Sequence, residues 1–178
     1  MHIVMRDERN TVGLLDLISE LPSNLTMAEI GCYTGESTKL FMDSKKVDLL
    51  YAIDIWNTDY PIYGFWVAKD TNGNYEYTGY ETAEMVFDKR MKGYNIVKYK
   101  SDLENAVHRL PGLDFVYIDA DHDYKYVCSD IKNSLKVLKP NSFIGGHDYC
   151  NHSVARAVNE LLGEPDMVFV DHSWLIKL

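Results

Sequence analysis

The sequence predicts an α/β fold, a three-layer αβα sandwich around a mostly parallel seven-stranded sheet with a closing antiparallel strand. Short apolar runs of strand length alternate with segments of helical periodicity along nearly the whole chain. Several of these strands are apolar without a break, as in parallel sheets that helices cover on both faces. The 178 residues, 46% hydrophobic and 25% charged, suit one domain with its own core, and we expect a single domain over residues 1–178.

Each predicted element follows from apolar spacing and from residues that begin or end helices. The first helix begins near Asn10 and Thr11, which are good caps, and ends before Pro22. A later helix ends at Pro140 and carries an apolar stripe at Val127, Ile131, Leu135 and Leu138. The predicted strands cover residues 25–30, 49–55, 95–99, 114–119, 142–146, 167–170 and 174–177, and the other helices cover 37–44, 82–91, 103–110 and 154–162.

Residues 56–80 interrupt this alternation as an aromatic-rich insertion. The turn signal Asn72-Gly73-Asn74 within it suggests a hairpin. Aromatic rings stack on sugars and planar rings. The insertion could therefore act as a lid that covers a small-molecule acceptor. Tyrosine and tryptophan are also enriched at protein interfaces, so a contact within a homodimer is an equal alternative.

Composition argues against several classes of function. Asp and Glu outnumber Lys and Arg by 27 to 18, a formal net charge of −9, whereas general nucleic-acid binding needs a basic face. Apolar runs stay far below the ~20 residues that span a membrane, and the N-terminal segment shows no signal peptide. Three cysteines without a CxxC pair argue against a disulfide framework. We therefore expect a cytoplasmic protein that binds neither nucleic acid nor membranes.

A glycine-containing turn follows the first predicted strand, with Glu29, Gly31 and Gly35 in acid-x-Gly-x-x-x-Gly spacing. Glycine lets a backbone turn sharply and come close to a ligand. The turn is not the dinucleotide fingerprint, because Tyr33 replaces its second glycine, and it is not a P-loop, because no lysine follows. Asp54 ends the next strand, where a carboxylate can accept hydrogen bonds from ribose hydroxyls.

These residues resemble the first two motifs of the class I S-adenosylmethionine-dependent methyltransferases, and the resemblance covers roughly residues 25–178. It implies that S-adenosylmethionine is the cofactor. By this likeness the glycines approach its methionine part, Asp54 holds the ribose, and Ile55 and Trp56 flank the adenine. For Trp56, packing within the lid is an equal alternative. The implied cofactor-binding residues are Glu29, Gly31, Tyr33, Gly35, Ser37, Asp54, Ile55, Ser101, Asp102 and Asp119.

A second group of polar residues ends two predicted strands that would be neighbours in the sheet. Asp119 and His122 follow one strand, and His147 and Asp148 follow the next. Carboxylate oxygens suit Mg²⁺, Ca²⁺ or Mn²⁺, whereas an imidazole favours Mn²⁺, Fe²⁺ or Zn²⁺. We expect Asp119, His147 and Asp148 to hold a cation that lowers the pKa of a substrate hydroxyl. Asp119 and His122 are the predicted catalytic residues, with His122 as the base because histidine titrates near pH 6.5. An alternative is that such residues only cap helices and strand ends.

The Asp-Ala-Asp-His run from Asp119 to His122 resembles the metal-dependent O-methyltransferase branch, which includes catechol, caffeoyl-CoA and macrolide-sugar types. It is most similar to the macrocin-type sugar O-methyltransferases, grouped with cephalosporin-hydroxylase-like proteins. Asp119 matches the metal-ligand Asp of that branch, and His122 matches its base. His147 departs from the branch, which has a carboxylate at that position. The resemblance implies methylation of a hydroxyl on a sugar or small natural product. Two alternatives stay open: a non-catalytic module that binds S-adenosylmethionine or S-adenosylhomocysteine, and a metal-independent N-methyltransferase.

Overall fold

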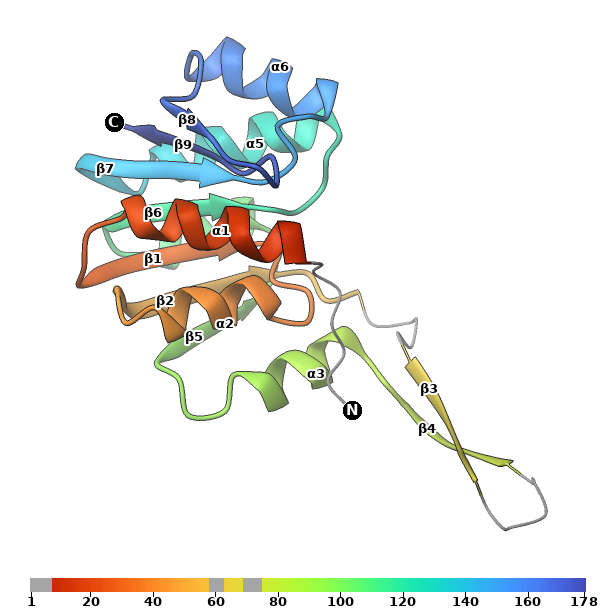
Figure 1. Ribbon diagram of the computed structural model, residues 1–178. Coiled ribbons are helices and arrows are strands. Elements are labelled where there is room, and N and C mark those ends of the chain that lie inside the picture. The colour runs from red at the N-terminus through yellow and green to blue at the C-terminus, as the bar shows by residue number, and fades with distance from the viewer. Residues whose placement is uncertain (1–7, 58–62, 69–74) are drawn as a thin grey trace.

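The computed structural model describes residues 8–57, 63–68 and 75–178. Its main sheet contains β1 (Leu25–Ile30), β2 (Val47–Asp54), β5 (Ile96–Lys100), β6 (Leu113–Ile118), β7 (Leu138–Gly146), β8 (Met167–Val168) and β9 (Trp174–Lys177). The strands lie in the order β5-β2-β1-β6-β7-β9-β8 (Figure 1). The first five pair in parallel, and β9 runs antiparallel to both β7 and β8. The predicted sheet with its antiparallel closing strand is confirmed.

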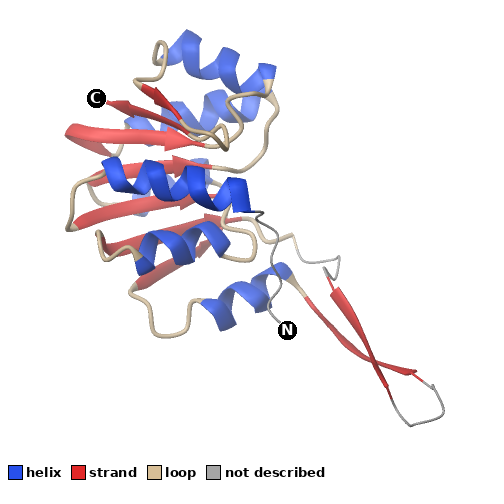
Figure 2. Cartoon of the chain, in the orientation of Figure 1, coloured by secondary structure: helices blue, strands red, loops and turns tan. Residues whose placement is uncertain are grey.

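Helices cover both faces of this sheet (Figure 2). One face carries α1 (Glu8–Glu20), α2 (Glu36–Asp43) and α3 (Ala83–Arg90), and the other carries α4 (Leu103–Ala106), α5 (Tyr124–Leu135) and α6 (His152–Leu161). A 3₁₀ turn, η1 (Val107–Arg109), extends α4. On the first face, Phe41 packs edge-on against Phe115 and Tyr117 of β6, at centroid distances of 5.9 and 5.1 Å. Of the helices that the structure describes, none has the length and apolar character needed to cross a bilayer.

Two local predictions are wrong. Leu138 and Pro140 belong to β7, not to the preceding helix. α5 ends at Leu135, which is 42% exposed, so the apolar spacing at its end does not mark a buried face. Proline is tolerated in this strand because the pairing of β7 with β6 is irregular near its start. The first helix begins at Glu8, before its predicted cap at Asn10, because apolar periodicity does not locate the first turn of a helix.

The insertion forms a separate antiparallel hairpin of β3 (Tyr63–Ala68) and β4 (Tyr75–Glu81), which confirms the predicted hairpin. Figure 1 shows it extending away from the α/β body. The turn signal Asn72-Gly73-Asn74 lies outside the described residues. The aromatic lid and the homodimer contact therefore stay predictions.

Candidate active site

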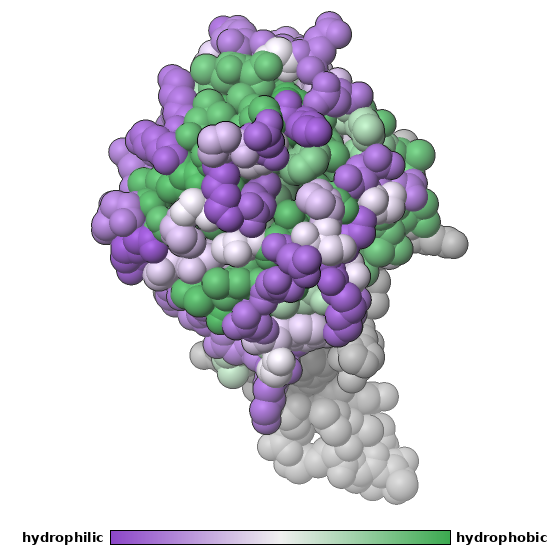
Figure 3. Space-filling view, turned by 90° about the vertical axis from the view of Figure 1, so that its left-hand side faces the viewer, coloured by the Kyte–Doolittle hydropathy of each residue, from purple (hydrophilic) through white to green (hydrophobic). Residues whose placement is uncertain are grey.

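A cavity of about 690 Å³ opens at the carboxyl ends of β1, β2, β5 and β6. Its volume is that of a small-ligand site, roughly 300–1,000 Å³. The opposite end of the sheet, which faces the viewer in Figure 3, shows polar and apolar residues intermixed. Seven of the predicted cofactor-binding residues line the cavity: Gly31, Tyr33, Asp54, Ile55, Ser101, Asp102 and Asp119. Strand ends far apart in the sequence thus form one concave surface.

Gly31 allows the ends of β1 and β6 to meet. Its φ is +87°, and a Cβ atom there would lie 2.1 Å from the backbone oxygen of Asp119. The Asp119 N–H donates to the Ile30 carbonyl at 2.8 Å, which fixes this approach. Gly35 also has a positive φ, of +79°, but its Cβ would meet the ring of Phe87 at 2.9 Å rather than backbone. The first glycine is therefore required by backbone packing as well as by conformation.

Asp54 braces the glycine loop. Its Oδ2 accepts from the Tyr33 N–H at 2.8 Å, and its Oδ1 accepts from the Trp56 N–H at 2.7 Å. The Trp56 indole N–H donates in turn to the Tyr33 carbonyl at 2.8 Å, so Tyr33, with φ of +46°, is held from both sides. Each carboxylate oxygen has two lone pairs, so Asp54 can hold the loop and still accept a hydrogen bond from a ligand hydroxyl.

Trp56 does not line the cavity, and the expectation that it flanks the adenine is wrong. The ring is buried in the core, 4.8 Å from the Phe87 ring centroid. The Lys98 ammonium lies 4.8 Å above its centroid, a cation–π contact. Ile55, in contrast, lines the cavity and is 59% exposed, so it is the apolar surface that a ligand would meet.

Glu29 lies beneath the loop, and neither it nor Gly35 nor Ser37 is part of the cavity lining. Its buried carboxylate accepts hydrogen bonds from the hydroxyls of Ser37 and Thr38, the latter at 2.5 Å. These charge-assisted bonds offset the cost of burying the carboxylate and tie β1 to the first turn of α2. A direct cofactor contact of these three residues stays a prediction.

α5 supplies a wall of the cavity that the sequence analysis missed. Tyr126, Ser129 and Asp130 line it from one face of this helix. Burial, together with the charges of Asp102 and Asp121, raises the pKa of Asp130 from 3.8 to about 7. The polar spacing on α5 could have signalled this wall, but only once the opposite, apolar face was known to pack on the sheet.

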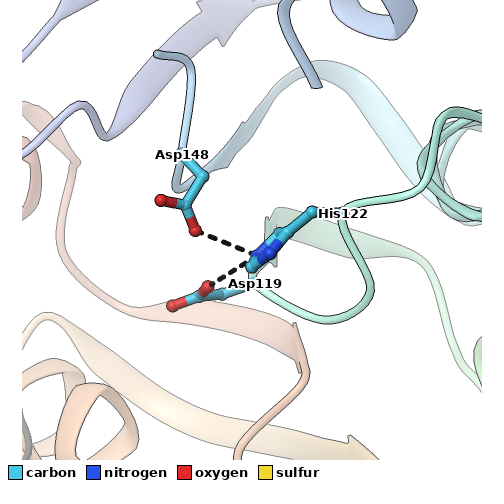
Figure 4. A group of neighbouring side chains, drawn as sticks. All are labelled: Asp119, His122 and Asp148. Carbon is cyan, nitrogen blue, oxygen red and sulfur yellow. Dashed lines mark ion pairs between the residues drawn. The ribbon is translucent and has the colours of Figure 1, made fainter. Parts of the chain in front are cut away.

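Asp119, His122 and Asp148 form a cluster at the rim of this cavity (Figure 4). One ligand atom of each residue lies within 4.8 Å of the others. The His122 Nε2 is 2.9 Å from Asp148 Oδ2 and 4.0 Å from Asp119 Oδ1. These carboxylates, Asp119 first, raise the pKa of His122 above its ordinary value. The predicted convergence of the two strand ends is therefore what the structure shows.

His147 lies beside the same carboxylates. Its Nδ1 is 3.1 Å from Asp148 Oδ2 and 4.0 Å from Asp119 Oδ1. Gly146 allows this placement, because a Cβ atom there would lie 2.4 Å from the Ile118 carbonyl oxygen, and the His147 N–H donates to that same oxygen at 3.0 Å. The compact group of donors is thus Asp119, His122 and Asp148, and the predicted ligand His147 lies next to Asp148. Carboxylates combined with imidazole fit a divalent cation of the Mn²⁺, Fe²⁺ or Zn²⁺ type.

Comparison with known families matches a model described as "Methyltransferase domain" to residues 28–149. This range contains the glycine loop, Asp54 and the whole histidine–carboxylate cluster. The chain is also 26% identical, over 146 residues, to the uncharacterized protein R132 of Acanthamoeba polyphaga mimivirus. That match covers 79% of this chain and 61% of the relative, so the chain spans about three fifths of the relative's length.

Two solved structures show the same fold. A ribosomal protein L11 methylase from Lactobacillus delbrueckii subsp. bulgaricus has a TM-score of 0.62 at 13% identity, covering 96% of this chain and 78% of the other. An O-methyltransferase from Bacillus cereus in complex with SAH has a TM-score of 0.59 at 13% identity, covering 97% and 81%. The sheet and its flanking helices therefore form the Rossmann-like methyltransferase fold. Because one neighbour is named for a protein acceptor, the fold alone does not identify the acceptor.

Proposed function

We propose, since this chain belongs to the methyltransferase-domain family, that it methylates a hydroxyl group of a small molecule, such as a sugar, with the help of a divalent cation. The family match and the fold support S-adenosylmethionine as the methyl donor. The observation that carries the finer proposal is the position of Asp119. This residue lines the large cavity and also belongs to the cluster with His122 and Asp148, so the cofactor cavity and the cluster meet at one side chain.

The cavity fits S-adenosylmethionine, which supplies a methyl group on a positively charged sulfur. We assign the methionine part to the side of the cavity that Gly31 and Tyr33 line. We assign the ribose hydroxyls to Asp54, whose carboxylate keeps acceptor capacity on the cavity side. Ile55 offers an apolar face to the adenine, and Ser101 and Asp102 offer polar groups to its edge. Carboxylates along the wall favour a cationic ligand over a phosphorylated nucleotide.

The cluster fits a divalent cation through the chemistry of its donors. Asp119, Asp148 and His147 would hold the ion, which would lower the pKa of a bound hydroxyl. The side chain of His122 is 45% exposed, so an acceptor at the cavity rim can reach it. We assign the removal of the hydroxyl proton to the His122 imidazole, through Nδ1, because Nε2 lies 2.9 Å from Asp148 Oδ2 and carries the proton that faces this carboxylate.

Calorimetry with S-adenosylhomocysteine, with and without Mn²⁺ or Mg²⁺, tests the cofactor and the cation separately. We expect binding of the nucleoside, and a separate binding isotherm for the cation. Methyl transfer to a panel of hydroxyl acceptors should then stop when a chelator is added and return with Mn²⁺. Failure to bind the nucleoside would overturn the cofactor assignment, and hydroxyl methylation that survives chelation would remove the cation from the mechanism. Chelator-resistant transfer to amine acceptors, with none to hydroxyls, would favour the metal-independent N-methyltransferase.

The role of His122 is tested by His122→Ala, with His108→Ala as the matched control because His108 is exposed and lies outside the cavity and the cluster. The first variant should bind S-adenosylhomocysteine normally and lose methyl transfer, whereas the control should keep both. Loss of cation binding in His122→Ala would identify His122 as a ligand instead of the base. Transfer at the control's rate would remove His122 from the mechanism.

A further inference from the structure

We propose that Asp171 is a positioning residue that keeps a proton on Nε2 of His147, so that the Nδ1 lone pair of this imidazole faces a cation between Asp119 and Asp148. Asp171 lies in the turn between β8 and β9, outside both the cavity lining and the cluster. The inference rests on the proposed function only in taking the cluster as a cation site. It assigns a task to a carboxylate remote in sequence from every predicted site residue.

Asp171 is fully buried, and its contacts fix where each oxygen points. Its Oδ1 accepts from the backbone N–H of Ser173 at 3.0 Å, and its Oδ2 accepts from the Ser173 hydroxyl at 2.8 Å. The same Oδ2 lies 3.8 Å from Nε2 of His147. Burying a carboxylate costs several kcal/mol unless donors surround it. At 3.8 Å this contact is electrostatic and not a hydrogen bond, but the buried negative charge of Asp171 still favours a proton on the facing nitrogen, Nε2.

The backbone holds Asp171 and His147 in this relation. A Cβ atom on Gly13 would lie 2.1 Å from Asp171 Oδ1, so α1 passes directly over the carboxylate. Glycine inside a helix costs about 1 kcal/mol relative to alanine, and this close approach explains its use here. On the other side, the N–H of Tyr149 donates to the His172 carbonyl at 3.0 Å. This bond fastens the loop after His147 to the turn that carries Asp171.

The two nitrogens of His147 therefore face different partners. Nδ1 faces Asp148 and Asp119, at 3.1 and 4.0 Å, and Nε2 faces Asp171. A neutral imidazole carries one proton, and only the nitrogen without it can bind a cation. When the carboxylates of the cluster face a cation, Asp171 is the carboxylate left to hold the proton. A carboxylate behind a ligating histidine commonly fixes its tautomer in this way, and removing it weakens metal binding about 10–100-fold.

Asp171→Asn gives a sharp test because its amide has one acceptor. The backbone N–H of Ser173 cannot turn and needs that acceptor at the Oδ1 position, whereas the Ser173 hydroxyl can rotate and accept. The amide NH₂ therefore occupies the Oδ2 position and faces Nε2. This arrangement drives the proton of His147 to Nδ1, the nitrogen that should bind the cation. Mn²⁺ affinity, measured by electron paramagnetic resonance, should fall about 10–100-fold. Binding of S-adenosylhomocysteine should stay unchanged, because Asp171 does not line the cavity.

Asp166→Asn is the matched control, since this exposed carboxylate also accepts a backbone N–H in the same region, from Lys177 at 2.8 Å. It should leave Mn²⁺ affinity unchanged. A measurement on the unmodified chain decides the question even where Asp171→Asn fails to fold. With diamagnetic Zn²⁺ bound, ¹⁵N spectra should show His147 ligated through Nδ1 and protonated at Nε2, with its signal identified by its loss in His147→Gln.

Ligation through Nε2, or an Asp171→Asn variant that binds Mn²⁺ as tightly as the unmodified chain, would overturn the inference while leaving the proposed function intact. If the unmodified chain binds neither Mn²⁺ nor Zn²⁺, the metal-assisted function fails and the role of Asp171 fails with it.

Discussion

Replacing Gly31 by alanine separates the two reasons for a glycine in the glycine loop. The first is conformational, because φ is +87°. The second is steric, because the new Cβ would lie 2.1 Å from the Asp119 carbonyl oxygen, and real Cβ atoms essentially never come closer than 3.0 Å. Gly163 provides a matched control, since its φ is +91° and a Cβ there would meet nothing within 4 Å. The control carries only the conformational cost.

The expected magnitudes differ several-fold. A left-handed backbone costs a non-glycine residue roughly 1–2 kcal/mol, so Gly163→Ala should lose about 1 kcal/mol. At Gly31 the neighbouring backbone must also move by roughly 1 Å to relieve the overlap. That movement strains the hydrogen bond from the Asp119 N–H to Ile30, and losing a buried bond of this kind costs about 1–3 kcal/mol. We expect Gly31→Ala to lose about 3–5 kcal/mol in total.

Urea unfolding gives the two free energies, and calorimetry with S-adenosylhomocysteine shows the effect on the cavity. In buffer without urea, where the variant remains folded, Gly31→Ala should also lose nucleoside binding, because Gly31 and Asp119 line the same cavity. Gly163→Ala should bind normally. Equal stability losses in the two variants would refute the steric argument. They would mean that the backbone at the end of β6 moves to make room for the Cβ atom with no loss of stability.

Three further variants test other parts of the site. Asp54→Ala leaves two backbone N–H groups without their acceptor and should weaken S-adenosylhomocysteine binding at least about tenfold in calorimetry; unchanged affinity would contradict the bracing role. Glu29→Gln should lower stability by about 1–2 kcal/mol in urea unfolding, because an amide NH₂ faces one of the two hydroxyls that donate to the carboxylate. Its nucleoside affinity should stay near normal, and a large loss of affinity at unchanged stability would show direct cofactor contact. The folded chain should hold a proton on Asp130 up to about pH 7, whereas the unfolded chain releases it near its ordinary pKa of 3.8, so stability falls as pH rises between these values. Solvent in the cavity should limit this effect to about 1–2 kcal/mol, and Asp130→Asn should remove that part of the pH dependence; an unchanged slope would refute the assignment.

Local signals in the chain were sufficient for the order of elements and for part of the site. The strand over residues 25–30 was predicted with the bounds it has, because its apolar run stops at Gly31. Asp54 was placed at the end of a strand for the same reason, and it does line the cavity. Such signals fail where a residue's neighbours in sequence do not decide its surroundings, as with Trp56, whose ring packs on Phe87 of α3 instead of facing the ligand space.

The sequence by itself determined the α/β class, the glycine loop and the two strand ends that carry the histidine–carboxylate cluster, because each depends on residues a few positions apart. Only the tertiary structure decided which distant residues share one environment. It placed Asp130 in the cavity wall through the packing of α5, and it placed Asp171 behind His147 through the turn between β8 and β9. The physical reason is that side-chain positions across a sheet depend on strand register and helix packing, which are set by the whole core and not by local spacing.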